Sequence, residues 1–238
     1  MDCRIGIIGD GPTDLRVIGK LAECIVSYGQ TDPISPEIFE LRQQNLRTPV
    51  DRYWERATRE EDYHIASEAG KRLQMDAVAL LWGAVEELKF RAKCDSLSYR
   101  DMIVLSTDAE KRLNTIDGYF EDYAIHLAKV LMVAVEKLYH QMVEWGIGRR
   151  FIPTIVPLPL FPSTEIIVAA ARENSLSFRG RTARELKSLL YNVNDMSLLS
   201  LDDLDRQALA HITTESLDRI FRFVPEVRYL VHTLIWRT

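Results

Sequence analysis

The chain has 238 residues, of which 47% are hydrophobic and 27% charged, and its net charge is −5. These values are typical of a globular protein with one large domain, and the acidic balance does not favour general nucleic-acid binding. The cysteines Cys3, Cys24 and Cys94 form no CxxC pair, which argues against a structural zinc site or a disulfide framework. The residues after Met1 do not resemble a secretion signal, and the most apolar predicted helix, about 124–143, contains charged side chains. We therefore expect a cytoplasmic protein without a membrane span.

The first predicted strand, Arg4 to Gly9, is followed by a turn and a helix. The apolar run ends in the turn Asp10–Asp14, and apolar residues then recur at helical spacing from Leu15 to Ala22. A glycine and a proline in the turn suit a sharp bend and the first helical position. Asp10 would thus follow the carboxyl end of a strand, where open α/β sheets bind ligands. The alternative is that Asp10 and Asp14 only cap the helix.

The rest of the chain alternates between strand and helix patterns. Further strands are predicted at 37–42, 102–105 and 151–158, and prolines in the last one indicate a sheet edge. Helices are predicted over 50–70, 71–93, 120–145, 166–173, 181–191, 200–211, 214–222 and 225–236. This order predicts an α/β fold with a mostly parallel sheet flanked by helices, an inserted helical region and a helical C-terminal part.

Carboxylates follow three of the predicted strands. Asp10 follows the first, Asp108 and Glu110 follow the strand at 102–105, and Glu165 comes just after the last. Because parallel strands end at one edge, these acids could meet, and like charges so close require a divalent cation between them. An all-oxygen set suits Mg²⁺ or Mn²⁺ rather than zinc. The sequence therefore predicts a metal site able to bind phosphates and activate water.

The segment Ser163-Thr164-Glu165 has a second interpretation. Ser163 can cap the helix that follows, and Glu165 falls in its first turn, where the helix dipole favours a negative charge. This capping role and a role in the metal site are compatible with each other.

Basic residues gather in two places, although the chain is acidic overall. Between Arg172 and Tyr191 five basic side chains stand against two acidic ones, and a further pair precedes the last strand. Such clusters are often only solvated surface, but they are where a polyanion would be received. The candidate nucleic-acid-binding residues are Arg149, Arg150, Arg179, Arg181 and Arg184.

The acidic motifs and their order resemble a TOPRIM domain, the metal-binding fold shared by topoisomerases, primases and a class of nucleases. TOPRIM domains typically carry Glu-Gly-x-x-Asp after the first strand, and Asp10–Asp14 is similar, with Asp in place of Glu. They also carry Asp-x-Asp after a later strand, which Asp108-Ala109-Glu110 resembles. The OLD (overcoming lysogenization defect) type of TOPRIM nuclease adds Ser-x-Glu, matched by Ser163-Thr164-Glu165, and a downstream lysine, for which Lys187 is the candidate.

This resemblance, over about residues 3–30 and 100–190, implies a Mg²⁺- or Mn²⁺-dependent nuclease that acts on DNA or RNA. Ser163 would orient the phosphate, and Lys187 would offset the charge that develops on it. The implied metal ligands are Asp10, Asp14, Asp108, Glu110 and Glu165, and the implied catalytic residues are Asp10, Glu165, Ser163 and Lys187. The alternative is a binding or regulatory module without cleavage, which the two substituted motif positions and the acidic net charge favour.

The resemblance also bears on partners and on domain organisation. OLD-type proteins often act with an ABC-type ATPase in bacterial defence against phages. Because this chain has no Gly-x-x-x-x-Gly-Lys-Ser/Thr loop, such an ATPase would be a separate subunit. We expect a TOPRIM-like domain over 1–191, with a helical insertion at about 50–95, and a helical extension over 192–238. The oligomeric state is left open.

Overall fold

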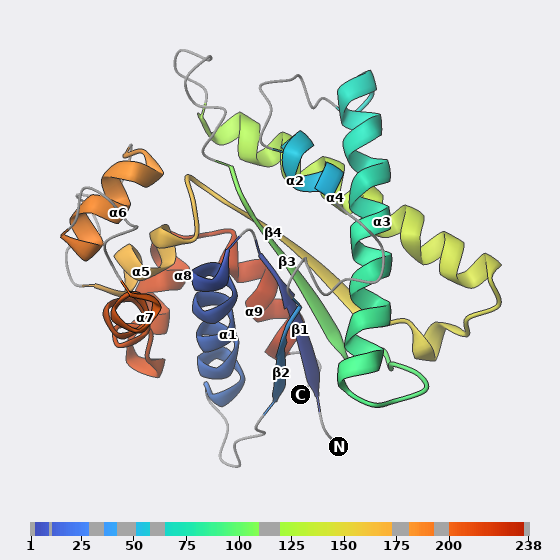
Figure 1. The fold of residues 1–238 in the computed structure, drawn as a ribbon, viewed down its shortest axis with the longest axis horizontal. Helices are drawn as coiled ribbons and strands as arrows, with labels where there is room; N and C mark the ends of the chain where they lie inside the picture. The colour runs from blue at the N-terminus through green and yellow to red at the C-terminus, as the bar shows by residue number, and fades with distance from the viewer. Residues whose placement is uncertain are drawn as a thin grey trace.

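A computed structural model of the chain describes residues 3–9, 11–28, 36–41, 51–57, 65–109, 120–172, 181–192 and 200–235. They form a parallel sheet with helices on both of its faces (Figure 1). The strands are β1 (Arg4–Ile8), β2 (Glu37–Glu40), β3 (Met102–Asp108) and β4 (Thr154–Leu160). Their order in the sheet is β2-β1-β3-β4. The predicted α/β class with a parallel sheet flanked by helices is confirmed.

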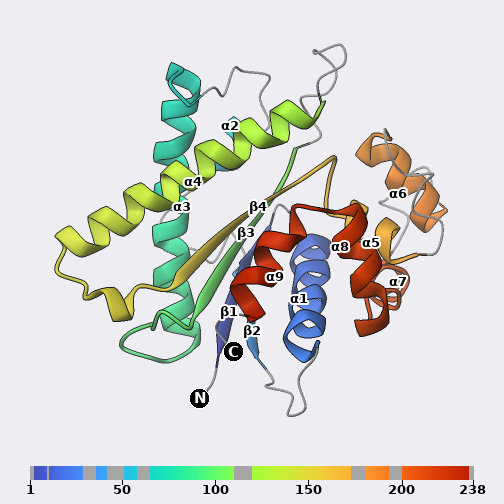
Figure 2. The same ribbon diagram turned by 180° about the vertical axis from the view of Figure 1, so that it is seen from behind.

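One face of the sheet packs against α1 and the helices that follow β4, and the other packs against the helices between β2 and β4 (Figures 1 and 2). The first set comprises α1 (Pro12–Ser27), α5 (Glu165–Ala171), α6 (Ala183–Tyr191), α7 (Leu201–Leu209), α8 (Leu217–Phe223) and α9 (Val227–Ile235). The second set comprises α2 (Asp51–Ala57), α3 (Glu68–Arg91) and α4 (Phe120–Glu144). Side chains alternate accordingly: Ile5 and Ile7 contact the first set, and Ile8 contacts the second. None of the described helices is both long enough and apolar enough to cross a bilayer.

Element boundaries differ from the predicted ones in ways that have local causes. The strand predicted at 102–105 continues to Asp108, because Ser106 to Asp108 pair with Leu158 to Leu160 of β4. The last strand begins at Thr154 rather than at 151, since Arg149–Phe151 form a 3₁₀ turn. β4 ends the strand order, as its prolines predicted.

The chain connections create a topological switch point between β1 and β3. From β1 the chain passes through α1 to β2 on one side, and then crosses the other face to β3, which pairs with β1 on its free side. Open parallel sheets bind ligands outside the carboxyl ends of the strands at such a point. Gly9, directly after β1, and Asp108, at the end of β3, are the residues brought to it.

An ion pair joins β1 to the start of β3 at the amino edge of the sheet. The Arg4 guanidinium donates from Nε and Nη2 to the two carboxylate oxygens of Asp101, each at 2.8 Å. Asp101 is fully buried and also accepts the Ser98 backbone N–H at 2.6 Å. This buried aspartate is thus bidentately paired and hydrogen-bonded.

Gly6 lies in β1 and faces Leu41, which follows β2, and Leu88 of α3. A Cβ added there would lie 2.6 Å from Leu41 Cδ1 and 3.4 Å from Leu88 Cδ2, and both leucines are fully buried. We expect Gly6→Ala to lower the free energy of unfolding by about 1–3 kcal/mol, as overpacking does. The measurement is the urea midpoint at an unchanged m-value.

Gly148→Ala is the matched control, because a Cβ there would make only ordinary contacts with Phe151, at 3.5 Å and beyond. Equal loss of stability in the two variants would contradict the packing of Gly6 described above.

Candidate acidic site at the carboxyl edge of the sheet

Three carboxylates gather at the switch point from separate parts of the chain. Asp14 lies in the first turn of α1, Asp108 is the last residue of β3, and Glu165 is the first residue of α5. Each carboxylate influences the others' charge: Glu165 raises the pKa of Asp14, and both of these acids raise the pKa of Asp108. The predicted meeting of acids at one edge of the sheet is therefore present for these three residues.

Asp14 also completes the start of α1. Its Oδ2 accepts the backbone N–H of Gly11, the N-cap residue, at 3.0 Å, so the capping alternative holds for Asp14. Removal from water, followed by the charge of Glu165, raises the pKa of Asp14 to about 6. Capping and membership of the acidic cluster thus coexist in one side chain. Asp10 lies outside the described residues.

Asp108 connects β3 to the start of α5. Its Oδ1 accepts the backbone N–H of Thr164 at 3.0 Å and the Thr164 hydroxyl at 3.3 Å. Removal from water and then the charges of Asp14 and Glu165 raise its pKa to about 8, although the Thr164 N–H opposes the shift. Asp108 therefore binds a proton at neutral pH unless a cation lies nearby.

Glu165 is held by two donors on its two oxygens. The buried Ser163 hydroxyl donates to Oε2 at 2.6 Å, and Lys187 Nζ on α6 lies 3.6 Å from Oε1. The expectation that Ser163 caps the helix is wrong. Thr164 holds the N-cap position with helical angles and makes no side-chain cap, and the Ser163 hydroxyl donates to the Glu165 carboxylate instead. The Ser-x-Glu spacing places the two side chains in contact.

The described residues provide negative charge without a complete metal site. Among them, no three His, Cys, Asp or Glu side chains are arranged to hold an ion. Two of the predicted ligands, Asp10 and Glu110, lie outside the described ranges. The oxygen chemistry and the mutual repulsion of Asp14, Asp108 and Glu165 nevertheless fit a hard divalent cation.

Tyr191 is a site residue that the sequence did not indicate. It lies on α6 four residues after Lys187, which places both side chains on one helix face. Its buried hydroxyl has no hydrogen-bond partner within the described chain, and burial, then the charge of Glu165, raises the pKa of the phenol. Helical spacing from Lys187 was the available signal.

The candidate basic residues divide between two ends of the sheet. Arg184 lies one turn before Lys187 on α6, and Arg181 directly precedes that helix, near the acidic edge. Arg149 and Arg150 lie in the 3₁₀ turn before the amino end of β4, with the Arg150 guanidinium 4.6 Å from the Phe151 ring centre. The structure does not bring this pair to the acids. Arg179 lies outside the described residues.

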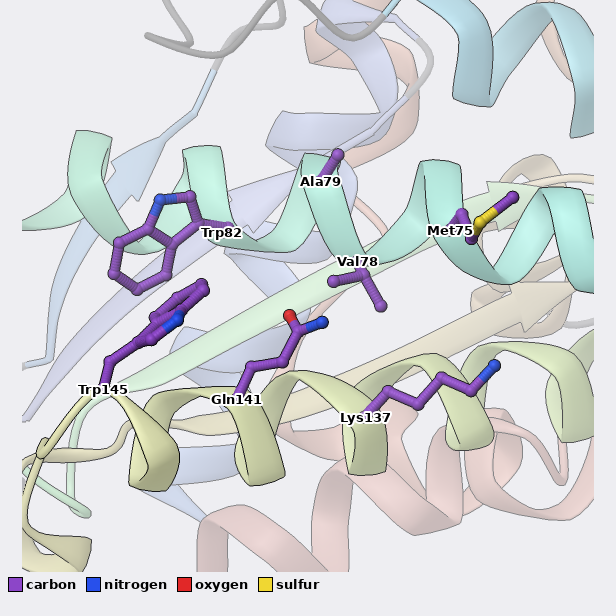
Figure 3. A pocket seen from close by; sticks show the side chains of 7 residues that line it. All are labelled: Met75, Val78, Ala79, Trp82, Lys137, Gln141 and Trp145. Carbon is purple, nitrogen blue, oxygen red and sulfur yellow. The ribbon is translucent and has the colours of Figure 1, made fainter.

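An apolar groove lies among the helices that cover the other face of the sheet. It measures about 300 Å³ and lies between α3 and α4, where Trp82 and Trp145 meet edge to face with ring centres 4.8 Å apart (Figure 3). The lining residues are Met75, Val78, Ala79, Trp82, Lys137, Gln141 and Trp145. Because none of them is a carboxylate, this groove cannot supply the metal chemistry predicted from the sequence.

Comparisons with known protein families, with curated proteins and with solved structures find no match to this chain. The resemblance to TOPRIM domains therefore stays a prediction. Its support is the geometry of the acidic edge itself.

The raised pKa values predict how stability depends on pH without divalent cations. Asp14 and Asp108 bind protons more tightly in the folded chain than in the unfolded one, so stability falls as pH rises from about 4 to about 8. Each such proton contributes a slope of up to about 1.4 kcal/mol per pH unit. We expect Asp108→Asn, which cannot ionise, to gain stability relative to the wild type across this window, measured by urea unfolding in EDTA.

The control is Asp202→Asn, an exposed aspartate of α7. The interpretation fails if Asp108→Asn and the wild type lose stability in parallel between pH 5 and pH 8.

Proposed function

We propose that this protein is a TOPRIM-like, Mg²⁺- or Mn²⁺-dependent nuclease that cleaves phosphodiester bonds in DNA or RNA. The main support is the gathering of Asp14, Asp108 and Glu165 at the switch point, where burial and then repulsion raise the pKa of Asp108 to about 8. Carboxylates that cannot all stay ionised together favour the binding of a cation, which compensates their negative charge. Lys187, close to Glu165, is the neighbouring cation.

The proposed ligands are Asp14, Asp108 and Glu165, with Asp10 and Glu110 as the further ligands that the sequence predicts. All of them offer carboxylate oxygens, which suit Mg²⁺ or Mn²⁺. A bound ion would polarise the scissile phosphate and lower the pKa of the attacking water.

The protein's own groups fix the geometry of the acids before any ligand arrives. The Ser163 hydroxyl holds one oxygen of Glu165 at 2.6 Å, and Thr164 holds Asp108 through its N–H and hydroxyl. Carboxylates held in this way need no reorganisation during the reaction. The Lys187 ammonium, on the exposed side of Glu165, would stabilise negative charge developing on the phosphate or the leaving oxygen.

The resemblance to OLD-type nucleases extends the proposal to partners. A separate ABC-type ATPase subunit would regulate or deliver this nuclease, in cytoplasmic defence of a bacterium against phages. The substrate strand would cross α6, because that helix presents Lys187 and Arg184 one turn apart beside the acids.

A binding module without cleavage is the second candidate. It is favoured by one observation: among the described residues the acids do not form a complete metal-ligand set. The discriminating experiment is incubation with single- and double-stranded DNA and RNA in Mg²⁺, Mn²⁺ or EDTA. Retention of the nucleic acid without cleavage in either metal would favour the binding module.

We expect Glu165→Gln to reduce metal-dependent cleavage by at least about 100-fold, since it removes a ligand charge and leaves the size of the side chain unchanged. Initial rates of cleavage in Mn²⁺ are the measurement, and circular dichroism checks the fold. Glu136→Gln, an exposed residue of α4, is the matched control. Equal rates for Glu165→Gln and the wild type would remove Glu165 from the active site.

The salt dependence of nucleic-acid binding tests the role of α6. We expect Arg181→Gln/Arg184→Gln to reduce the slope of log K against log salt by about 0.9 for each duplex DNA phosphate that the protein no longer neutralises. Arg149→Gln/Arg150→Gln removes the same number of charges from the opposite edge of the sheet and should leave the slope unchanged. The reverse pattern would place the nucleic acid at the amino edge instead.

A further inference from the structure

A polar pocket of about 850 Å³ lies beyond the C-terminal end of α5, away from the acids at its N-terminal end. It is bounded by the last residues of α5, α6 and α7 and by the start of α8. The residues that matter for its chemistry are Arg172, Arg219, His211 and Glu215. Because α5 has seven residues at about 1.5 Å each, the two ends of the helix are separated by roughly 10 Å.

Two partly buried arginines line this pocket, and within the described residues each guanidinium donates from one nitrogen only. Arg172 Nη2 donates to the Gln207 carbonyl at 3.1 Å, and Arg219 Nη2 donates to the Ala171 carbonyl at 2.5 Å. Both Nε atoms are buried and have no acceptor in the described chain. An arginine carries five N–H donors, so backbone carbonyls satisfy only a small part of each group.

No described carboxylate neutralises either arginine. Neither guanidinium forms an ion pair with another described residue. Glu215, the acid of the lining, is exposed and is engaged at the start of its own turn, where the Thr213 hydroxyl lowers its pKa. Partly buried cations without a counter-ion are costly, and a ligand that supplies the negative charge removes that cost.

His211 is the third side chain of the pocket that can carry a positive charge. Burial, and then the positive charge of Arg172, lower its pKa. An anion in the pocket would offset the charge of Arg172 and so favour the protonated imidazole. The three groups thus converge from α5, the end of α7 and α8 on one space.

We propose that this pocket binds a phosphate group, held between the guanidiniums of Arg172 and Arg219. Planar guanidiniums with paired donors match the oxygens of phosphate, and the volume lies within the range of nucleotide-sized ligand sites. The inference goes beyond the proposed nuclease activity, since it uses none of the acids and needs no metal. Two sources share this chemistry: a small phosphate compound such as a mononucleotide, and the terminal phosphate of a nucleic-acid strand.

Titration calorimetry with inorganic phosphate, in EDTA, tests the proposal independently of the metal site. We expect Arg172→Gln and Arg219→Gln each to weaken phosphate binding by about tenfold or more, as the loss of a charged hydrogen-bond donor does. Arg222→Gln, one turn further along α8 and exposed, removes the same charge and should stay within about twofold of the wild type. Equal weakening in all three variants, or in none, overturns the proposal.

A second measurement uses the wild-type chain and so does not depend on the folding of any variant. An arginine-selective dicarbonyl reagent, mapped by mass spectrometry, should modify Arg172 and Arg219 more slowly when phosphate is present, with Arg222 unaffected. Repeating this with a nucleoside monophosphate and with 5′-phosphorylated and 5′-hydroxyl oligonucleotides separates the sources. Protection by the small compounds, or by the 5′-phosphorylated strand alone, supports the site and names its ligand. If none of these compounds protects Arg172 and Arg219, the proposal is wrong.

Discussion

Electrostatic repulsion among Asp14, Asp108 and Glu165 is the main constraint on the carboxyl edge of the sheet. The fold tolerates it because each acid has a compensating donor: the Gly11 N–H, the Thr164 N–H and hydroxyl, and the Ser163 hydroxyl with Lys187. These donors do not offset burial and repulsion completely, since together these two effects keep the pKa values of Asp14 and Asp108 raised. The remaining imbalance is what a divalent cation would relieve.

At the opposite edge of the same sheet, a buried acid is compensated by a basic side chain. Asp101, at the amino end of β3, is fully buried, and its carboxylate is bidentately paired with Arg4. The chain therefore can neutralise a buried acid with an arginine where the role is structural. Among Asp14, Asp108 and Glu165 at the carboxyl edge, the one described ion pair joins Glu165 to Lys187. Acidic side chains whose negative charge is only partly compensated belong to binding sites more often than to purely structural contacts.

The parallel sheet and the meeting of the acids could be predicted because both follow from local patterns. Asp108 ends a β-strand and Glu165 opens a helix, and parallel strands must end at one edge. The place of Arg149 and Arg150, at the edge opposite the acids, also follows from the sequence, because the pair precedes the last strand and parallel strands all begin at one edge. The capping role predicted for Ser163 was wrong, because the residue pattern does not fix the N-cap position, which Thr164 occupies, and the Ser163 hydroxyl donates to Glu165. Tyr191 was missed because only the packing of α6 brings its hydroxyl near Glu165. Helical periodicity places Tyr191 on the same face of α6 as Lys187, but it does not show which residues that face contacts.

Helix α5 relates the acidic edge to the arginine pocket. Its first residue is Glu165, and Arg172 follows its last residue, so the negative charge lies at the positive end of the helix and the positive charge at its negative end. The helix dipole therefore stabilises the charge at each end of α5, and the two charges do not neutralise each other. A phosphate bound at Arg172 would lie about one helix length from the carboxylates, on the same element that positions Glu165. Because α5 packs against both α6 and α8, a change in how these helices meet would be felt at Lys187 and at Arg219 together. The acidic edge and the arginine pocket therefore lie at opposite ends of one helix, and the helices that carry Lys187 and Arg219 both pack against it.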